Sequence, residues 1–566
     1  MKKIISIVCA FIATACMMSC DSLLDVNPQD KITDLSYWKK PDEFQLVANR
    51  FYTYLLGGGL YDRNSDLAYN SRDRDSESNG TYVAPESDGE WNNNYTNLRT
   101  VNYLLMQAEN YSGNKDAIKQ YVAEAYFFRA YIYHNLLYRF GGVPIVTIPL
   151  DINSGDLQAP RDSREKVVEF ILQDLDLAIS GGLPLENDIP STEKGRISRQ
   201  AAQALKARVA LYEATWEKFR ENASNVNNLL DIAIAESENV INSNTYTLFT
   251  LLADSSYKYL FILENQKSNP GNFTKKDNKE FVLCRKYESG IASFSVAHNL
   301  LQQYTPTRTM ADMYVTQNGL PIDHPGNTQF LGKQHPRDEY MNRDLRMWNT
   351  LRVPGIKYYC YGTMARDYND PDAVGIGIQV ATPGEGYACH KLMTERDSQG
   401  GGEGQDWPII RYPEVLLTYA EALFERNGNI SNADLNRSVN IIRARGKITP
   451  LSNEFIAANG LDMRTELRRE RTVELFMENR RLDDLKRWHT AVEDLRKPML
   501  GILYTGTETE QSFPNDPSNP FALDAEGYIV YEPASSRYFS EKNYLHPIPL
   551  AQRFLNPNLE QNPGWE

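Results

Sequence analysis

Apolar residues recur every three or four positions in two long stretches of the chain, which is the spacing of an amphipathic helix. The clearest example lies between 199 and 216, where five apolar residues share one helix face: Ala202, Leu205, Val209, Tyr212 and Trp216. The same pattern predicts helices over 42–56, 94–109, 121–140, 162–175, 227–242, 412–426, 433–445 and 463–488. Paired helices with alanine at packing positions, clearest over 198–242, predict a mainly α fold of degenerate tetratricopeptide-type hairpins that form a scaffold.

Between 243 and 406 the chain shows no sustained period and is rich in Gly, Pro, Asn, Asp and aromatic residues. So long a stretch is too large for one loop of a compact domain. We therefore expect an irregular, loop-rich subdomain packed on the scaffold, with 497–542 as a second insertion. The predicted division is a signal peptide at 1–19, a helical region with a ligand-binding loop at 20–242, the irregular subdomain at 243–406 and a C-terminal helical region at 407–566.

The N-terminus has the pattern of an export signal. A short basic start, Lys2 and Lys3, precedes an apolar run over 4–15 that is too short to span a bilayer as a permanent helix. Ser19 then precedes Cys20, which resembles a bacterial lipobox in which the chain is cut before Cys20 and that thiol is acylated; Met17 stands where leucine is usual. An ordinary secretory signal, with Cys20 an incidental thiol, is the alternative.

The net charge of the chain limits which classes of partner it can bind. The chain of 566 residues carries 60 Lys and Arg against 74 Asp and Glu, a net charge of -14, and loss of the two lysines in 1–19 makes it -16. No basic cluster suggests a nucleic-acid face, so no nucleic-acid partner is expected. Cys284, Cys360 and Cys389 match neither a disulfide framework nor a zinc pattern, and one bridge between an undetermined pair is possible.

Loops that carry aromatic and polar side chains are candidates for sugar binding, because sugar rings stack on Trp or Tyr while hydroxyls pair with Asp, Asn and Arg. Residues 57–95 fit this description, and 281–314 supplies a second aromatic flank. Within that flank Tyr287 is preferred because Arg285, Lys286 and Glu288 place polar groups beside it. Burial in the core is the alternative for each ring.

A partial calcium-loop pattern lies in the first of these segments. Five residues fall at positions 1, 3, 5, 6 and 12 of the template: Asp75, Glu77, Asn79, Gly80 and Glu86. Glutamate at position 3 is unusual, and Pro85 opposes the helix that should follow. A plain acidic surface turn is therefore preferred to bound calcium, and no other cofactor is expected.

Six segments in order carry a family resemblance: 24–40, 123–144, 411–445, 466–471, 478–488 and 545–565. Behind the lipobox-like start, they resemble the SusD/RagB family of Bacteroidetes outer-membrane lipoproteins. The resemblance implies a binding protein rather than an enzyme. Such a protein is held by a lipid anchor on the outer face of the outer membrane, and it passes oligosaccharides to a SusC-like TonB-dependent transporter. Some branches of the family take peptides instead.

The resemblance also implies ligand-binding residues. In starch-binding members the matching region contacts the ligand, which makes Asp66, Arg74, Trp91 and Asn94 candidates here, with Trp91 as the stacking platform. The alternative is that Trp91 and Tyr95, one turn apart, staple the helix that follows.

Enzyme hypotheses have little support in the sequence. There is no G-x-S-x-G, no H-E-x-x-H and no P-loop, and the seven histidines lie at no ligand spacing. A glycoside hydrolase needs only two suitably placed carboxylates, so it stays as a lower-ranked alternative. The run of Arg and Glu over 466–487 is interpreted as a charged helix face supported by i,i+4 pairs.

Overall fold

The computed structural model describes residues 37–59, 61–70, 74–220, 225–265, 268–293, 304–354, 386–393, 402–512, 514–518 and 520–566. The predicted signal peptide, Cys20 and Cys360 lie outside these residues. Within them, Cys284 and Cys389 both carry free thiols.

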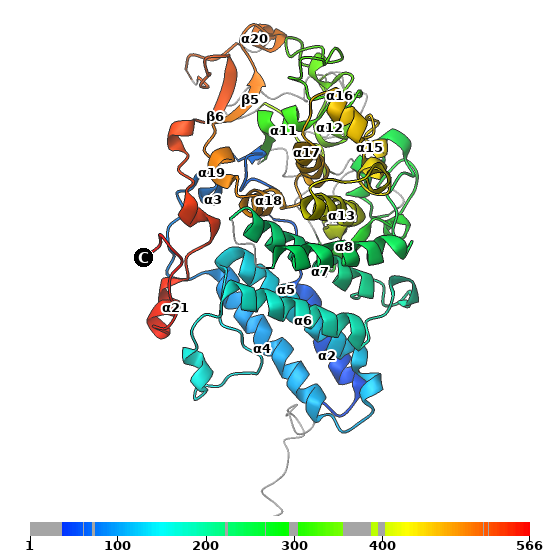
Figure 1. The fold of residues 1–566 in the computed structure, drawn as a ribbon, viewed down its shortest axis with the longest axis vertical. Coiled ribbons are helices and arrows are strands. Elements are labelled where there is room, and N and C mark those ends of the chain that lie inside the picture. The colour runs from blue at the N-terminus through cyan, green and yellow to red at the C-terminus, as the bar shows by residue number, and fades with distance from the viewer. Residues whose placement is uncertain are drawn as a thin grey trace, which may run out of the picture.

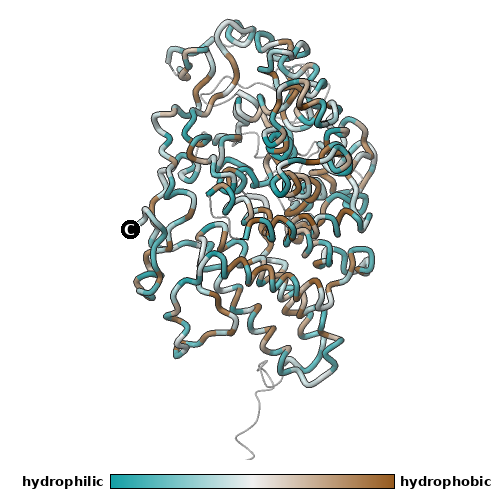
Figure 2. The backbone as a smooth tube through the Cα atoms, in the orientation of Figure 1, coloured by the Kyte–Doolittle hydropathy of each residue, from teal (hydrophilic) through white to brown (hydrophobic). Residues whose placement is uncertain are grey.

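Long helices stacked one on the next form the body of the molecule (Figure 1). They are α2 (Pro41–Phe51), α4 (Gly89–Asn110), α5 (Lys119–Phe140), α6 (Arg164–Gly181), α7 (Arg199–Lys218), α8 (Val226–Asn242), α13 (Tyr412–Asn427) and α17 (Met463–Leu475). From α4 to α8 each helix contacts the next, and the stack continues through α13 to α17. Figure 2 shows hydrophobic positions alternating with hydrophilic ones along these helices. The predicted mainly α scaffold of helical hairpins is confirmed.

Local sequence signals begin and end these helices. The side chains of Asp88, Ser163 and Ser198 accept hydrogen bonds from the first-turn amides of α4, α6 and α7. Gly141 and Gly428, both with positive φ, end α5 and α13.

Short elements complete the fold. The shorter helices are α3 (Ser76–Asn79), α9 (Ser256–Leu260), α11 (Arg308–Met313), α12 (Leu345–Thr350), α14 (Asn432–Asn436), α15 (Val439–Arg445), α16 (Asn453–Ala458), α18 (Arg481–Arg487), α19 (Ala491–Asp494), α20 (Glu508–Ser512) and α21 (Leu550–Leu555). The strands are β1 (Ala68–Tyr69), β2 (Phe281–Arg285), β3 (Thr305–Pro306), β4 (Trp407–Arg411), β5 (Met499–Leu503) and β6 (Tyr528–Glu532).

Three antiparallel strand pairs link distant parts of the chain. β1 pairs with β3, so the segment near residue 306 lies beside the N-terminal loop. β2 pairs with β4, which leads directly into α13, and β5 pairs with β6. The irregular region is thus joined by strands to both helical regions that flank it in sequence.

The predicted helix over 463–488 is two helices, α17 and α18, and the prediction of one is wrong. Met477 and Asn479 between them have positive φ. The carboxylate of Asp62 accepts a hydrogen bond from the Met477 amide at 2.6 Å. A partner 415 residues away therefore satisfies the backbone at the break.

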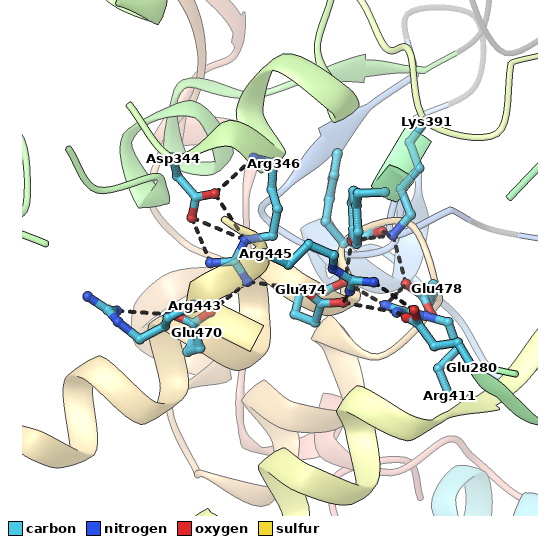
Figure 3. Close-up of polar contacts among 12 residues, drawn as sticks. Glu280, Asp344, Arg346, Lys391, Arg411, Arg443, Arg445, Glu470, Glu474 and Glu478 are labelled. Carbon is cyan, nitrogen blue, oxygen red and sulfur yellow. Dashed lines mark hydrogen bonds and ion pairs between the residues drawn. The ribbon is translucent and has the colours of Figure 1, made fainter. Parts of the chain in front are cut away.

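Most of the charged residues over 466–487 are buried and pair with residues from other elements, so the interpretation of this run as a charged helix face supported by i,i+4 pairs is also wrong. Glu474 is fully buried and pairs with Arg411, Arg445 and Arg346, which come from β4, α15 and α12. Arg411 also contacts Glu280 at 2.6 Å and Glu478 at 2.7 Å. Figure 3 labels five acidic and five basic residues of this network, which therefore balance in charge.

The network holds the irregular region to the helical stack, because Glu280 precedes β2 while Glu474 lies in the last turn of α17. Burial acts to raise the pKa of Glu474, but Arg445, Arg411 and Arg346 outweigh it and lower that pKa to about 2. Removing one member would leave the opposite charge buried and unpaired, and this strongly destabilises the folded state.

Candidate functional site

The two segments predicted to bind ligand, 57–95 and 281–314, meet in the fold. The pairing of β1 with β3 joins them, and the Tyr61 ring lies edge-on to Tyr304 with centroids 5.1 Å apart. The Arg285 guanidinium also donates to the Leu55 carbonyl at 2.8 Å. The end of β2, two residues before Tyr287, is thereby fixed against the start of the N-terminal loop.

A cleft of about 600 Å³ opens beside Tyr287, within the size range of small-ligand sites. Its lining contains four lysines, three acidic residues, one aromatic ring and several small or aliphatic side chains. These residues are Lys194, Glu264, Thr274, Lys275, Lys276, Lys286, Tyr287, Glu288, Ile291, Ala292 and Asp406. Tyr287 is half-buried, so part of its ring faces the cleft.

Gly57 allows the loop to approach Tyr287 closely. A Cβ atom at Gly57 would lie 2.4 Å from the Tyr287 hydroxyl oxygen, closer than such atoms approach in real structures. The Arg285 guanidinium lies 5.5 Å from the centre of the Tyr287 ring. Burial raises the pKa of Tyr287 although Arg285 acts to lower it, so the phenol stays neutral and keeps its hydrogen for donation.

Asp406 organises the floor of the cleft. Its carboxylate accepts from the Tyr287 amide at 3.2 Å and from the Lys286 ammonium at 2.7 Å. Lys275 donates to the Tyr287 carbonyl at 2.5 Å and pairs with Glu288 at 3.1 Å. These contacts fix the backbone on both sides of the Tyr287 ring.

The sequence did not single out Lys194, Lys275, Lys276 or Asp406. Lys194 lies in the turn before α7, Lys275 and Lys276 lie in the 3₁₀ helix Lys275–Asp277, and Asp406 directly precedes β4. No local sequence pattern connects these segments. The sequence shows that Lys275 and Lys276 are basic, but no sequence pattern indicates that they lie beside Tyr287 in the fold.

Asp66 is engaged by the protein itself. Its two carboxylate oxygens accept from the Arg481 guanidinium at 2.8 Å each, and the pair is buried. Burial acts to raise the pKa of Asp66, but Arg481 outweighs it and lowers that pKa. The carboxylate thus anchors α18 to the loop before β1.

Trp91 and Asn94 lie in the first turns of α4. The Trp91 ring is 5% exposed, with its centroid 5.0 Å from Tyr95 and 5.1 Å from Phe140. Asn94 donates to the Glu90 carbonyl at 2.7 Å. These contacts match the alternative in which Trp91 and Tyr95 staple the helix.

Arg74 is exposed. Of the five predicted ligand residues, only Tyr287 lines the cleft. No contact tests a ligand-binding role for Asp66, Arg74, Trp91 or Asn94, and their roles stay predictions.

The residues of the calcium-loop pattern have separate protein partners. Asp75 caps α3, Glu77 lies 3.2 Å from Arg139, and Asn79 donates to Glu532. Glu86 accepts through its backbone carbonyl from the Ala551 amide. Among the residues that the structure describes, no group of three or more His, Cys, Asp or Glu could hold a metal ion. Calcium binding here stays the weaker alternative to a plain acidic turn, and these contacts lend it no support.

A second cavity of about 540 Å³ lies near β6, with Tyr528 in its wall. The Arg308 guanidinium lies 3.7 Å from the centre of the Tyr528 ring and pairs with Asp312. Lys333 pairs with Asp312 as well. Because Arg308 already covers one face of the Tyr528 ring, this cavity is a weaker candidate for sugar stacking than the cleft at Tyr287.

Comparison with known proteins identifies the family. The model of the SusD family matches residues 262–565, more than half of the chain. The chain belongs to the SusD family. A second family model, described as starch-binding and associating with the outer membrane, matches residues 21–211 of this SusD-family protein.

Relatives and solved structures agree with this assignment. A SusD-like protein, P38, of Formosa agariphila is 24% identical over 89% of this chain and 95% of its own. A SusD-like protein of Bacteroides ovatus is 22% identical over 99% of this chain and 97% of its own.

Among structures, a SusD-like carbohydrate-binding protein from Bacteroides fragilis has a TM-score of 0.72 at 20% identity, with 92% of this chain and 99% of that chain covered. A laminarin-binding SusD-like protein has a TM-score of 0.58 at 19% identity, with 92% and 99% covered. These likenesses show the shared fold.

No helix in the described part of this SusD-family chain is long and apolar enough to cross a membrane.

Proposed function

We propose that this chain is a cell-surface lipoprotein that binds oligosaccharides and delivers them to a SusC-like TonB-dependent transporter of the outer membrane. The observation that carries the binding role is the cleft at Tyr287, where a half-buried ring lies among side-chain hydrogen-bond donors and acceptors in a space of about 600 Å³. Membership of the SusD family and the starch-binding description of the second matched model support it.

The cleft has the chemistry that a sugar requires. The exposed part of the Tyr287 ring can cover the apolar face of a pyranose, while Thr274 and Glu288 at the cleft can exchange hydrogen bonds with its hydroxyls. The backbone of Tyr287 is held by Asp406 and Lys275, so the ring is ordered before a ligand arrives. Such preorganisation reduces the entropy lost on binding.

The charge pairing in the cleft supports binding without turnover. A glycosidase needs two carboxyl groups free to act as acid and as base or nucleophile. Here Glu288 pairs with Lys275 and Asp406 with Lys286. We therefore rank a glycoside hydrolase below a binding protein, and a peptide-binding SusD-type protein remains the main alternative.

Attachment through an acylated Cys20 is part of the proposal, and the outer-membrane description of the matched model supports it. If it is correct, Cys20→Ser will move the protein from the membrane fraction to the soluble fraction. The transporter should co-purify with the wild-type chain after mild detergent extraction.

The binding role is tested by titrating a panel of oligosaccharides into the mature chain. Tyr287→Ala should lower the affinity about tenfold, the loss of one good contact, and Tyr287→Phe should keep most of it. Tyr538→Ala, at a 59% exposed tyrosine outside the cleft, is the matched control. Release of reducing ends would show a hydrolase, and binding of peptides but no glycan would favour the alternative.

A further inference from the structure

The solvent-accessible charge of the cleft is mainly positive, although the whole chain carries -14. The side chains of Lys194 and Lys286 are 45% and 49% exposed, and Lys276 is exposed as well. Of the three acidic lining residues, Asp406 and Glu264 are buried and only Glu288 is exposed. A ligand entering the cleft would therefore meet three ammonium groups and one carboxylate.

These lysines differ in how far the protein already neutralises them. Lys286 pairs with Asp406 at 2.7 Å, and Lys194 with Glu186 at 3.2 Å. Lys276 makes no ion pair with any residue in the described part of the chain. Its charge is therefore available to a ligand.

The exposed lysines Lys194, Lys276 and Lys286 form what we call the lysine rim of the cleft. Close packing joins the turn that carries Lys194 to the segment that carries Lys286. Gly195 has a φ of +108°, and a Cβ atom there would lie 2.9 Å from the Lys286 side chain. The stem of Lys286 thus lies directly on the turn that carries Lys194. This packing keeps two lysines at the same edge of the cleft as Tyr287.

We propose that the cleft binds an acidic glycan, an oligosaccharide bearing carboxylate or sulfate groups, with Tyr287 against a sugar ring and Lys276 and Lys286 paired with the anions. This inference rests on the proposed glycan-binding function and names its substrate class. The lysine ammonium groups make charge-assisted hydrogen bonds, which are about twice as strong as those between neutral groups, and an anionic acceptor adds a direct charge attraction that a neutral hydroxyl lacks.

The acidity of the rest of the protein does not prevent this binding. Charges more than about 10 Å from the cleft are largely screened at physiological salt, so the nearby lysines dominate what a ligand experiences. The lysine rim also discriminates against peptides rich in Lys and Arg, because like charges in a cleft repel.

Affinity electrophoresis of the mature chain through gels that contain one polysaccharide each tests the inference. Polygalacturonate and alginate supply carboxylates, carrageenan supplies sulfates, and starch, laminarin and xylan are neutral. We expect retardation in at least one acidic gel, and the carboxylate and sulfate gels distinguish the two sources of charge. The affinity should fall as salt is raised.

Variants separate the charge from the ring. Lys276→Gln should lower the affinity for the acidic glycan about fivefold and leave any neutral binding unchanged. Lys497→Gln, at a 57% exposed lysine outside the cleft, is the control.

Retardation by neutral polysaccharides alone, sensitive to Tyr287→Ala, would overturn the acidic class and leave the glycan-binding function standing. Retardation by none of the six would overturn both. An acidic affinity that Lys276→Gln and Lys286→Gln leave unchanged would also overturn the assignment to this cleft.

Discussion

Replacing His546 with glutamine should make the folded chain less sensitive to mild acid. His546 is 5% exposed, and its Nε2 lies 3.3 Å from the Glu77 carboxylate. Its Nδ1 is buried and has no hydrogen-bond partner among the residues that the structure describes, so a proton added there would create a buried, unpaired N–H group. Burial lowers the pKa of His546 to about 4, even though Glu77 acts to raise it.

The sign of the effect follows from the two pKa values. The unfolded chain takes up a proton on His546 below its ordinary pKa of about 6.5, whereas the folded chain does so only near 4. Stability is therefore complete above about pH 6.5 and falls as the pH is lowered toward 4. At about pH 5 the loss from this one group is about 2 kcal/mol, which lowers the melting temperature of a chain of this size by about 2 °C.

Melting temperatures measured by circular dichroism near pH 8 and near pH 5 test this reasoning. Glutamine can still donate to Glu77 but does not titrate, so His546→Gln should show a fall in melting temperature about 2 °C smaller than the wild type. His335→Gln, at a histidine whose side chain is 68% exposed, should behave as the wild type does. An equal fall in all three proteins would show that the pKa of His546 is the same in the folded and unfolded chain, and a smaller fall in the wild type than in His546→Gln would show that His546 is protonated beside Glu77 in the folded state.

Three further substitutions test separate parts of the structure. Gly57→Ala should push the Tyr287 ring aside and lower oligosaccharide affinity about tenfold without lowering the melting temperature. Glu474→Gln should destabilise the fold by about 3–5 kcal/mol, seen as a melting temperature lower by several degrees, because it leaves buried arginines short of a partner. If Trp91 packs the start of α4 rather than binding sugar, Trp91→Ala should also cost about 3–5 kcal/mol by leaving a cavity against Phe140, with sugar affinity of the folded protein unchanged in calorimetric titration.

Controls make these three outcomes decisive. Gly89→Ala adds a Cβ that meets no atom of the described residues within 4 Å, so binding should not change. Lys447→Gln breaks an exposed pair with Asp254 and should shift stability by less than about 1 kcal/mol. The reasoning about Trp91 would be refuted if Trp91→Ala abolished sugar binding at an unchanged melting temperature, since that would make it the stacking platform.

Much of the helical stack could be predicted from the sequence because its signals are local. The apolar period around 199–216 predicts α7, and Ser198 before it caps the helix that the structure shows. The break between α17 and α18 could not be predicted, since its cause is the distant carboxylate of Asp62. The charged run over 466–487 has the same local pattern whether it faces water or, as here, buried arginines.

The candidate site, too, could be predicted from the sequence only in part. Tyr287 could be proposed because polar residues flank it in sequence, and it lines the cleft. Trp91 looked equally suitable, yet its ring packs under Phe140, a contact that no sequence neighbour reveals. Lys286 is a sequence neighbour of Tyr287, but no pattern in the sequence connects Lys194 or Lys276 with that ring.

Sequence alone therefore determined the family resemblance, the helical class and most helix positions, because periodicity and capping depend on residues within a few positions of each other. Tertiary structure decided which rings are buried, which charges are neutralised and which lysines meet at Tyr287. Those properties depend on contacts between segments that come from separate parts of the chain, such as Lys286 with Asp406 and Asp62 with Met477.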